Sequence, residues 1–482
     1  MPSDLITSLF SDVWSIFLVV LFFGGSIFVH ELGHFLAARR RGAHVERFSI
    51  GIGPALFSWH GRDGVEYCIS WLPLGGYVLL PQLADLGPIE GKSTVDAGKL
   101  PPIDYVSKLI ILVAGAAFNV LFAFVLACIV WVAGQPTFSV LATTEIGNVS
   151  PTISLADGTS VPNPAAEAGL HAGDIVRSVD GHAVENFEDI FNAVMLGKGR
   201  DRDGRRLSVF AIERAGEPLT IPVYPRLLGD EKIRVAGVDP AEDLSAEAVL
   251  PGSPADLAGI KPGDRIVAID DQPVFQRATV AEHLAKFPDR PTRFLLARGT
   301  ARLTIAIQPR FETDENSGKK VARIGLRYHD NILVIHPKPW TQISEDAMMM
   351  FRTLDALISR NSDIGLSKLS GPIGIARTLH QQAQWDFRRV LWFTILVNVN
   401  LAIFNLLPIP VLDGGQILFA TLSRLRRREL PANVIIATQS AFFVLIFSLI
   451  IYVSFFDVGR WRRESKADQA EAAALRTAPA KP

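Results

Sequence analysis

Residues 13–38 read VWSIFLVVLFFGGSIFVHELGHFLAA, a stretch made mostly of apolar residues. A helix of this length and apolar character can cross the roughly 30 Å hydrocarbon layer of a membrane. Near its end stands the motif His30-Glu31-Leu32-Gly33-His34. Positions i and i+4 share one face of a helix, so both imidazoles can meet one metal ion, with Glu31 beside them. Ionisable groups are costly at membrane depth, so the motif predicts a functional metal site.

Three further apolar runs approach spanning length, at 109–133, 391–413 and 433–456. The mean hydropathy of +0.26 agrees with a chain that lies partly in lipid. Several runs of this length argue against buried helices of a large soluble core. The run at 13–38 is too long for a signal-peptide core, and no basic residue precedes it. The sequence therefore predicts a multi-pass α-helical membrane protein with about four transmembrane helices.

Basic residues near the ends of the apolar runs predict the orientation of the chain in the membrane. Residues 1–12 contain no Lys or Arg, whereas clusters of Arg follow at 39–41 and 424–428. These clusters place both of those segments in the cytoplasm and the long segment 134–389 outside. The Arg residues at 460–463 oppose this orientation, but the two internal clusters agree with each other.

Charge and cysteine content exclude other classes of function. The formal net charge of −1 gives no sign of a nucleic-acid partner. Cys68 and Cys128 are the only cysteines, too few for a disulfide framework or a Cys-ligated zinc site. We interpret both as packing residues.

Two histidines do not complete a catalytic zinc site, which needs a third protein ligand and an open position. The stretch NLLPIPVLDGG at 405–415 offers Asp413. Its two prolines interrupt the helix and its two glycines permit an unwound backbone, which is tolerated at membrane depth around a protein-enclosed cavity. In the predicted orientation both motifs lie near the cytoplasmic ends of their spans. We therefore expect Asp413 to meet His30 and His34.

The chain also contains an internal repeat. NPAAEAGLHAGDIVRSVDG at 163–181 aligns without gaps to SPADLAGIKPGDRIVAIDD at 253–271. Each copy predicts a short helix, a Gly-Asp turn and a β-strand. The copies resemble PDZ domains of bacterial envelope proteases. The resemblance implies two PDZ-like α/β domains, at 140–225 and 235–310, where a peptide C-terminus can add a strand. A role as a spacer or plug without a peptide ligand remains open.

Two segments after the repeats have simpler patterns. Residues 340–380 include apolar positions at three- and four-residue spacing, which predicts an amphipathic helical segment on the membrane surface or against the repeats. Residues 457–482 are rich in Ala, Lys, Arg and Glu, which predicts a disordered tail.

HELGH in the first span, LDGG at 412–415 and the PDZ-like repeats between them resemble the site-2 protease family of zinc intramembrane metalloproteases. The similarity is to its branch of bacterial regulator-of-sigma-E proteases with tandem PDZ domains. Further matching stretches are FSIGIGP at 48–54, LPLGGYV at 72–78 and SGPIGIA at 370–376. Ala116 departs from a Pro that the family commonly carries, and Leu79-Leu80 departs from a basic-Met pair. Both departures concern helix packing and substrate handling, and they spare the expected ligands.

The resemblance implies a role for each site residue. His30, His34 and Asp413 would bind Zn²⁺, Glu31 would be the catalytic acid and base, and Asn405 would help to hold the substrate backbone. Residues 39–108 would form a cytoplasmic, membrane-associated β-hairpin region.

The function implied is that of a zinc-dependent endopeptidase of the bacterial inner membrane, with the PDZ-like domains on the extracytoplasmic side. Its substrates would be single-span membrane proteins, such as a trimmed anti-sigma factor, or signal-peptide remnants. The other expected partners are peptide C-termini at the PDZ-like domains and membrane lipid, with no nucleic acid.

Two alternatives stay open at this point. A membrane hydrolase or transporter would keep the zinc without peptide chemistry. A PDZ-bearing membrane scaffold with a vestigial metal site would have no enzymatic activity. The presence of Glu31 beside all three expected ligands disfavours the scaffold.

Overall fold

The structure is a computed structural model of the chain, and it describes residues 2–83, 95, 99–155, 158–313, 320–329, 332–428 and 430–477. Parts of three predicted segments therefore lie outside the described residues, namely 84–94 and 96–98 of the hairpin region, 156–157 of the first PDZ-like domain and 478–482 of the tail. The chain divides into two compact units, which are described separately. The helical unit comprises Met1–Pro136, Val334–Arg352 and Leu369–Gly459, and the repeat unit comprises Thr137–Leu333, Thr353–Lys368 and Arg460–Pro482.

Long helices dominate the helical unit. They are α1 (Pro2–Arg40), α3 (Tyr105–Ala133), α10 (Phe387–Asn405) and the part of α12 (Ala432–Thr477) that ends at Gly459. Shorter elements are β1 (Arg47–His60), β2 (Glu66–Leu79), α9 (Pro372–Trp385), α11 (Asp413–Arg426) and the first part of α8 (Pro339–Ile358). Within the described residues, 4 helices are long and apolar enough to cross a membrane: Val13–Arg40, Tyr105–Ala133, Phe387–Asn405 and Asn433–Lys466. This confirms the predicted number of spanning helices.

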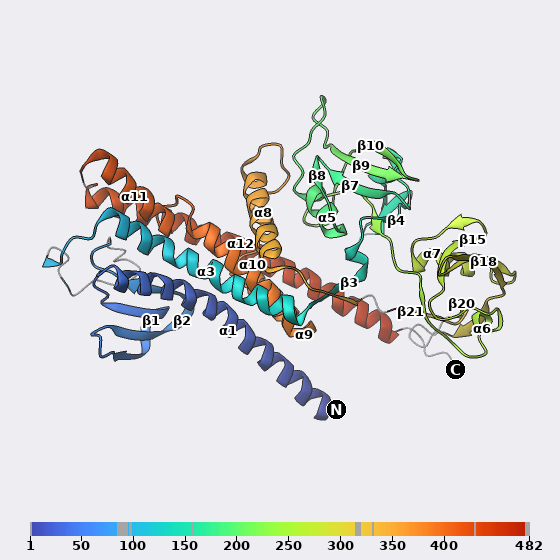
Figure 1. Cartoon of the computed structure of the whole chain (residues 1–482), viewed down its shortest axis with the longest axis horizontal. Helices are drawn as coiled ribbons and strands as arrows, with labels where there is room; N and C mark the ends of the chain where they lie inside the picture. Colours follow the sequence, from blue (N-terminus) through green and yellow to red (C-terminus); the bar gives the residue numbers. More distant parts are fainter. Residues whose placement is uncertain are drawn as a thin grey trace. The chain divides into compact units, whose positions relative to one another are not determined.

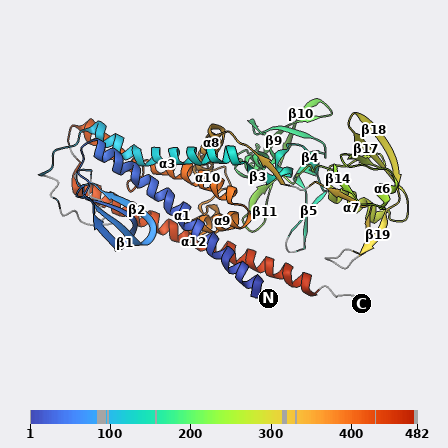
Figure 2. The same cartoon turned by 60° about the horizontal axis from the view of Figure 1, so that its bottom comes forward.

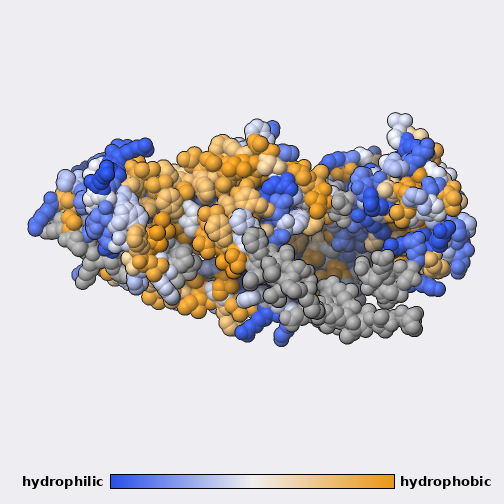
Figure 3. All heavy atoms as spheres, turned by 90° about the horizontal axis from the view of Figure 1, so that it is seen from below, coloured by the Kyte–Doolittle hydropathy of each residue, from blue (hydrophilic) through white to orange (hydrophobic). Residues whose placement is uncertain are grey.

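Helix α3 lies at the centre of the helical unit, with α1 and α10 packed along it (Figures 1 and 2). Apolar side chains of α3 and α10 interlock in one buried cluster: Ala123, Leu126, Ala127, Val130, Leu391, Ile395 and Val399. The outward faces of these helices are apolar as well, and Figure 3 shows hydrophobic residues gathered over the helical part. Exposed apolar surface of this extent is typical of helices that lie in lipid.

The third span is shorter than the predicted helix at 391–413. Helix α10 ends at Asn405, residues 406–412 are not helical, and α11 begins at Asp413. Pro408 and Pro410 explain the break, because proline has no backbone N–H to continue the helical hydrogen bonds. The interruption that the two prolines predict is therefore present, and the helix of this span ends at Asn405.

The predicted amphipathic segment at 340–380 is two helices. Helix α8 ends at Ile358, and α9 begins only at Pro372. The buried carboxylate of Asp457 fixes the start of α9, because it accepts hydrogen bonds from the backbone N–H groups of Gly371 and Gly374 at 3.0 and 2.8 Å. These are N–H groups that a helix leaves unpaired at its first turn.

Helix α12 corrects the prediction of a disordered tail from residue 457. The helix continues to Thr477, far beyond the apolar run that crosses the membrane. Ala, Glu, Lys, Arg and Gln dominate this extension, and these residues have high helix propensity. The composition that makes this extension hydrophilic therefore also favours an α-helix.

Strands β1 and β2 are long and bent. Each of them contributes two separate segments to one sheet. Residues 66–70 pair with 55–60 on one side and with 47–50 on the other. Residues 47–50 pair in turn with 76–79, which form the edge of this sheet. Apolar residues alternate at 65–71, which is typical of a strand, and β2 contains most of this stretch.

The repeat unit contains two similar β-rich domains. The first contains β4 (Ile146–Asn148), β5 (Thr152–Ser154), β6 (Ser160–Pro162), α4 (Pro164–Ala168), β7 (Ile175–Val179), β8 (His182–Ala183), α5 (Phe187–Met195), β9 (Ser208–Arg214), β10 (Glu217–Val223), β11 (Arg226–Leu228), β12 (Ile233–Val235) and β13 (Asp239–Pro240). The second contains β14 (Ala246–Val249), α6 (Pro254–Leu257), β15 (Arg265–Ile269), β16 (Gln272–Pro273), α7 (Arg277–Lys286), β17 (Thr292–Arg298), β18 (Ala301–Ile307), β19 (Arg310–Thr313), β20 (Lys320–Arg323) and β21 (Leu326–Tyr328). Two further strands are β3 (Gln135–Phe138) and β22 (Ile332–Ile335).

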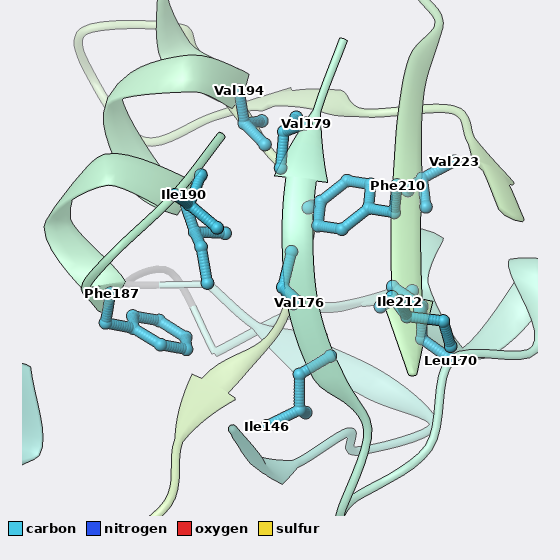
Figure 4. Packing of buried hydrophobic residues seen from close by; sticks show 13 residues of the cluster. Ile146, Leu170, Val176, Val179, Phe187, Ile190, Val194, Phe210, Ile212 and Val223 are labelled. Atoms are coloured by element: carbon cyan, nitrogen blue, oxygen red, sulfur yellow. The ribbon is translucent and has the colours of Figure 1, made fainter. Parts of the chain in front are cut away.

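The main sheets have the orders β10-β9-β7-β8 and β16-β15-β17-β18, so corresponding strands occupy corresponding places. In the first domain, apolar residues of α5 face those of β7 and β9 (Figure 4). The labelled core of Figure 4 contains Ile146, Leu170, Val176, Val179, Phe187, Ile190, Val194, Phe210, Ile212 and Val223. Each domain therefore has a core of its own.

Both domains extend beyond their predicted ends at 225 and 310. The first core includes Ala236, and the second includes Ile324, while β21 pairs with β14. The sequence pattern missed these extensions because short strands far from the repeat motif carry little periodicity of their own.

Candidate metal centre

The HELGH motif lies on α1, with all three ionisable side chains buried. The exposed fractions are 9% for His30, 9% for Glu31 and 8% for His34. One helical turn separates the two histidines, so their Nε2 atoms lie only 3.2 Å apart. The helix therefore directs both nitrogens to one point, as the spacing predicts.

Asp413 brings a carboxylate to the same point from α11. Its Oδ2 lies 3.4 Å from the Nε2 atoms of both His30 and His34. This oxygen is buried and accepts no hydrogen bond from the residues that the structure describes. A buried carboxylate oxygen without a donor is costly unless a cation satisfies it.

These three side chains form a group that could hold a metal ion, with one candidate ligand atom from each lying within 4.8 Å of the others. Two imidazole nitrogens and one carboxylate oxygen are a donor set that zinc accepts in catalytic sites. Such sites keep one further position open for water or substrate. The residues therefore fit a catalytic zinc ion.

The chain turn before α11 explains how Asp413 reaches this place. A Cβ on Gly414 would lie 2.2 Å from the carbonyl oxygen of Leu407, and one on Gly415 would lie 2.1 Å from that of Ile409. Only glycine permits this close return of the broken segment over the start of α11. The Pro-Gly pattern thus positions the carboxylate, as the sequence predicts for an irregular backbone.

Helix α3 supports the two histidines from behind. The backbone carbonyl of Ile111 accepts a hydrogen bond from Nδ1 of His34 at 2.8 Å, because a carbonyl oxygen cannot donate. That bond fixes the proton on Nδ1 and leaves the Nε2 lone pair directed to the centre. A Cβ on Gly115 would lie 2.3 Å from Nε2 of His34. Sequence reasoning missed Ile111 and Gly115 in these roles, because a carbonyl carries no residue signal.

Asn405 and Glu31 complete the group of predicted residues. Asn405 is the last residue of α10, and its Nδ2 lies 3.3 Å from Nε2 of His30. The backbone of β2 passes close to Glu31, since a Cβ on Gly76 would lie 2.9 Å from Cγ of Glu31. The structure therefore brings together all five residues that the sequence singles out.

One cavity of about 180 Å³ contains this group. Its lining residues come from α1, β2 and the residues just after it, α3, the end of α10, the segment before α11 and α11 itself: His30, Glu31, His34, Gly76, Tyr77, Val78, Leu80, Leu83, Ile111, Leu112, Asn405, Val411, Leu412, Asp413 and Gln416. The edge strand at 76–79 thus borders the space in front of the candidate metal centre.

Spanning helices around a buried His-His-Asp group with an adjacent Glu define a membrane-embedded metallopeptidase. The family model described as "Peptidase family M50" matches residues 17–449 of this chain. The chain therefore belongs to this family of site-2 type zinc metalloproteases. This membership supports an enzyme and removes the basis for a scaffold with a vestigial site.

Individual relatives agree with the family. Protease RseP of Yersinia pestis is 30% identical over 86% of this chain and 92% of its own length. Regulator of sigma-E protease RseP of Escherichia coli is 28% identical over 86% and 92%. A Vibrio cholerae protein named "Putative zinc metalloprotease" is 29% identical over 93% of this chain and 99% of its own. The similarity therefore covers both the helical unit and the repeat unit.

Proposed function

We propose that this protein is an intramembrane endopeptidase that cuts single-span membrane proteins within their membrane segment. The observation that carries the proposal is the group His30, His34, Asp413 and Glu31 inside one cavity between apolar spanning helices. A peptidase site at that place serves substrates that are themselves in the membrane. A relative is named regulator of sigma-E protease, and the substrate class that we propose is a trimmed anti-sigma factor, with signal-peptide remnants as a second.

His30 and His34, each through Nε2, and the carboxylate of Asp413 would hold the zinc ion. When bound, zinc polarises the scissile carbonyl and lowers the pKa of a water molecule to roughly 7. The Glu31 carboxylate takes a proton from the attacking water and passes it to the leaving amine nitrogen as the C–N bond breaks. Glu31 is therefore a base and then an acid, and it is not a ligand.

Asn405 holds the substrate backbone beside the centre. Its amide nitrogen is 3.3 Å from His30, so the same N–H₂ group can donate to a substrate carbonyl in the cavity. The edge strand at 76–79 offers further backbone groups. A substrate helix hides its amides, so it must unwind locally, and pairing with this edge replaces part of its lost hydrogen bonds.

The sheet of β1 and β2 lies against the membrane. Its large apolar side chains at Leu56, Phe57, Trp59 and Trp71 are 65%, 63%, 46% and 68% exposed. Exposed aromatic residues of this kind favour the interface between lipid and water. Lipid contact would hold the edge strand at the depth at which the substrate enters.

The orientation proposed from the sequence places the arginines at 39–41 and 424–428 in the cytoplasm and the repeat domains outside the bacterial inner membrane. The two repeat domains are PDZ-like, and they gate access or bind a newly exposed C-terminus. The matching arrangement of strands in their main sheets supports this proposal.

Glu31→Gln separates chemistry from metal binding. Because Gln cannot take a proton but leaves the three ligands in place, purified Glu31→Gln protein is expected to keep native zinc content. It should cut a tagged single-span substrate in detergent at least about 100-fold more slowly than the native protein. Activity within tenfold of native at equal zinc content would refute the role of Glu31.

A further inference from the structure

Asn119 is a buried polar residue on α3 that has no role in the proposed reaction. Its exposed fraction is 0%, and its side chain points to the ring of His30. The amide Nδ2 lies 3.3 Å from Nδ1 of His30, and Oδ1 accepts no hydrogen bond from the described residues. Burying an amide between apolar spans is costly without hydrogen bonds, so its contact with His30 calls for a role.

The protonation of His30 decides what this contact can be. Nε2 of His30 faces Nε2 of His34 and Oδ2 of Asp413, at 3.2 and 3.4 Å. A neutral ring that binds a metal through Nε2 carries its proton on Nδ1. An Nδ1–H group and an amide N–H₂ group are both donors, and they cannot bond to each other.

Rotation of the Asn119 amide by half a turn removes this conflict. The two ends of an amide have nearly the same size, so the rotated amide fills the same space. The rotated Oδ1 then occupies the position 3.3 Å from Nδ1 of His30 and accepts its proton. Metal-binding histidines commonly donate their second N–H in this way.

We propose that Asn119 is a positioning residue that accepts a hydrogen bond from Nδ1–H of His30 and so fixes the ring and its tautomer for zinc. The inference rests on the proposed ligand role of His30. It completes a symmetric arrangement, because the carbonyl of Ile111 on the same helix accepts from Nδ1 of His34. Helix α3 thus orients both ligand rings from behind while contributing no ligand itself.

Three full-length variants test this proposal by zinc affinity, measured through competition with a chelating dye in detergent. Asn119→Leu removes the acceptor at similar size, and it should weaken zinc binding about 10- to 100-fold. Asn119→Asp keeps an acceptor and removes the donor, and its affinity should stay within about threefold of native. Asn398→Leu is the matched control, since Asn398 is equally buried but bonds to Ser26 and Thr394.

The Asp variant alone distinguishes the two orientations of the contact. If the native amide donated to an unprotonated Nδ1, Asn119→Asp would lose the bond and weaken zinc binding more than tenfold, which would overturn the proposal. Native affinity in Asn119→Leu, or an equal loss in Asn398→Leu, would overturn it as well. A His30→Ala variant with native zinc affinity would instead show that the ligand assignment itself is wrong.

Discussion

At Gly115 the backbone of α3 passes so close to the two histidines that a single added carbon would occupy the place of the His34 ring. Asp413 gains its position by a similar close approach, through Gly414 and Gly415. The centre therefore depends on small residues that have no chemistry of their own. They set the distance between chain segments, and the functional side chains fill what remains.

The first prediction at this scale concerns Asp413. Asp413→Ala leaves two protein ligands, and a catalytic zinc site needs three, so zinc content and cleavage should both be lost. Elemental analysis of purified protein measures the zinc. Asp104→Ala is the control, because Asp104 also stands at a helix start but caps α3 at an exposed position. Normal zinc stoichiometry in Asp413→Ala would place the third ligand elsewhere.

The predicted site residues could be identified because each has distinctive chemistry in a setting where chemistry is rare. His30, Glu31 and Asp413 are ionisable groups near apolar runs, which narrows the search to a few positions. The carbonyl of Ile111 and the close approach at Gly115 could not be predicted. They depend on how α3 is rotated against α1, and both helices are apolar over most of their circumference.

At the scale of secondary-structure elements, identical positions of the two repeats have the same structural role. Gly169 and Gly259 both adopt positive φ, +82° and +81°, at the ends of α4 and α6. Asp174 binds Arg214 through two hydrogen bonds, and Asp264 binds Arg298 in the same way. The pairing with Arg298 lowers the pKa of Asp264. The aspartates could be predicted from the aligned motif, but their arginine partners could not, because they lie on strands outside it.

A cluster of arginines around Asp363 anchors the segment after α8 within the repeat unit. Asp363 bonds to Arg206 at 3.0 Å and to Arg234 at 2.7 Å, and the Arg234 side chain is fully buried. Burial alone would raise the pKa of Asp363, but hydrogen bonds from Arg206 and Arg234 outweigh it and lower the pKa to about 2. The charged carboxylate therefore compensates a buried cation.

Replacement of Asp363 tests this anchor. Asp363→Asn leaves Arg234 buried without its counter-charge, so it should destabilise the repeat unit by about 2–4 kcal/mol at pH 7. Because the folded pKa is depressed, the native protein has the full benefit above pH 4 and loses it as the pH falls toward 2. Thermal unfolding of the full-length variants in detergent measures the difference, which should narrow over that range.

Asp355→Asn is the matched control for this anchor. Asp355 lies near the end of α8 and pairs with Lys198, but its side chain is 64% exposed. Exposed ion pairs contribute about 0–1 kcal/mol, so this variant should unfold close to the native temperature. An equal effect in both variants, or a constant difference down to pH 2, would contradict the role given to Asp363.

At the scale of the whole molecule, the helical unit and the repeat unit have different roles. Every residue that lines the candidate metal centre belongs to the helical unit. The length of the apolar runs predicts the spanning helices, since membrane thickness is a strong constraint on sequence. The bent sheet of β1 and β2 could be predicted only as a hairpin region. Its double pairing depends on bends that no local pattern encodes.

Deletion of the repeat domains tests whether they gate the site. A protein without residues 140–329, joined by a short flexible linker, should still cut a pre-trimmed single-span substrate. It should also cut the untrimmed form, because the proposed restraint on entry is gone. The ratio of the two cleavage rates before and after deletion is the measurement. A folded, zinc-loaded deletion protein that still refuses the untrimmed substrate would rule out the gate.

The position of the cut tests the central claim most directly. The native protein and a single-span substrate are reconstituted together in lipid vesicles, with Glu31→Gln protein as the blank. Mass spectrometry of the products then gives the new termini. We expect these termini inside the apolar segment of the substrate, in its cytoplasmic half, because His30 lies near that end of α1 in the proposed orientation. Termini only in the water-exposed flanks, with an intact apolar segment, would contradict intramembrane cleavage.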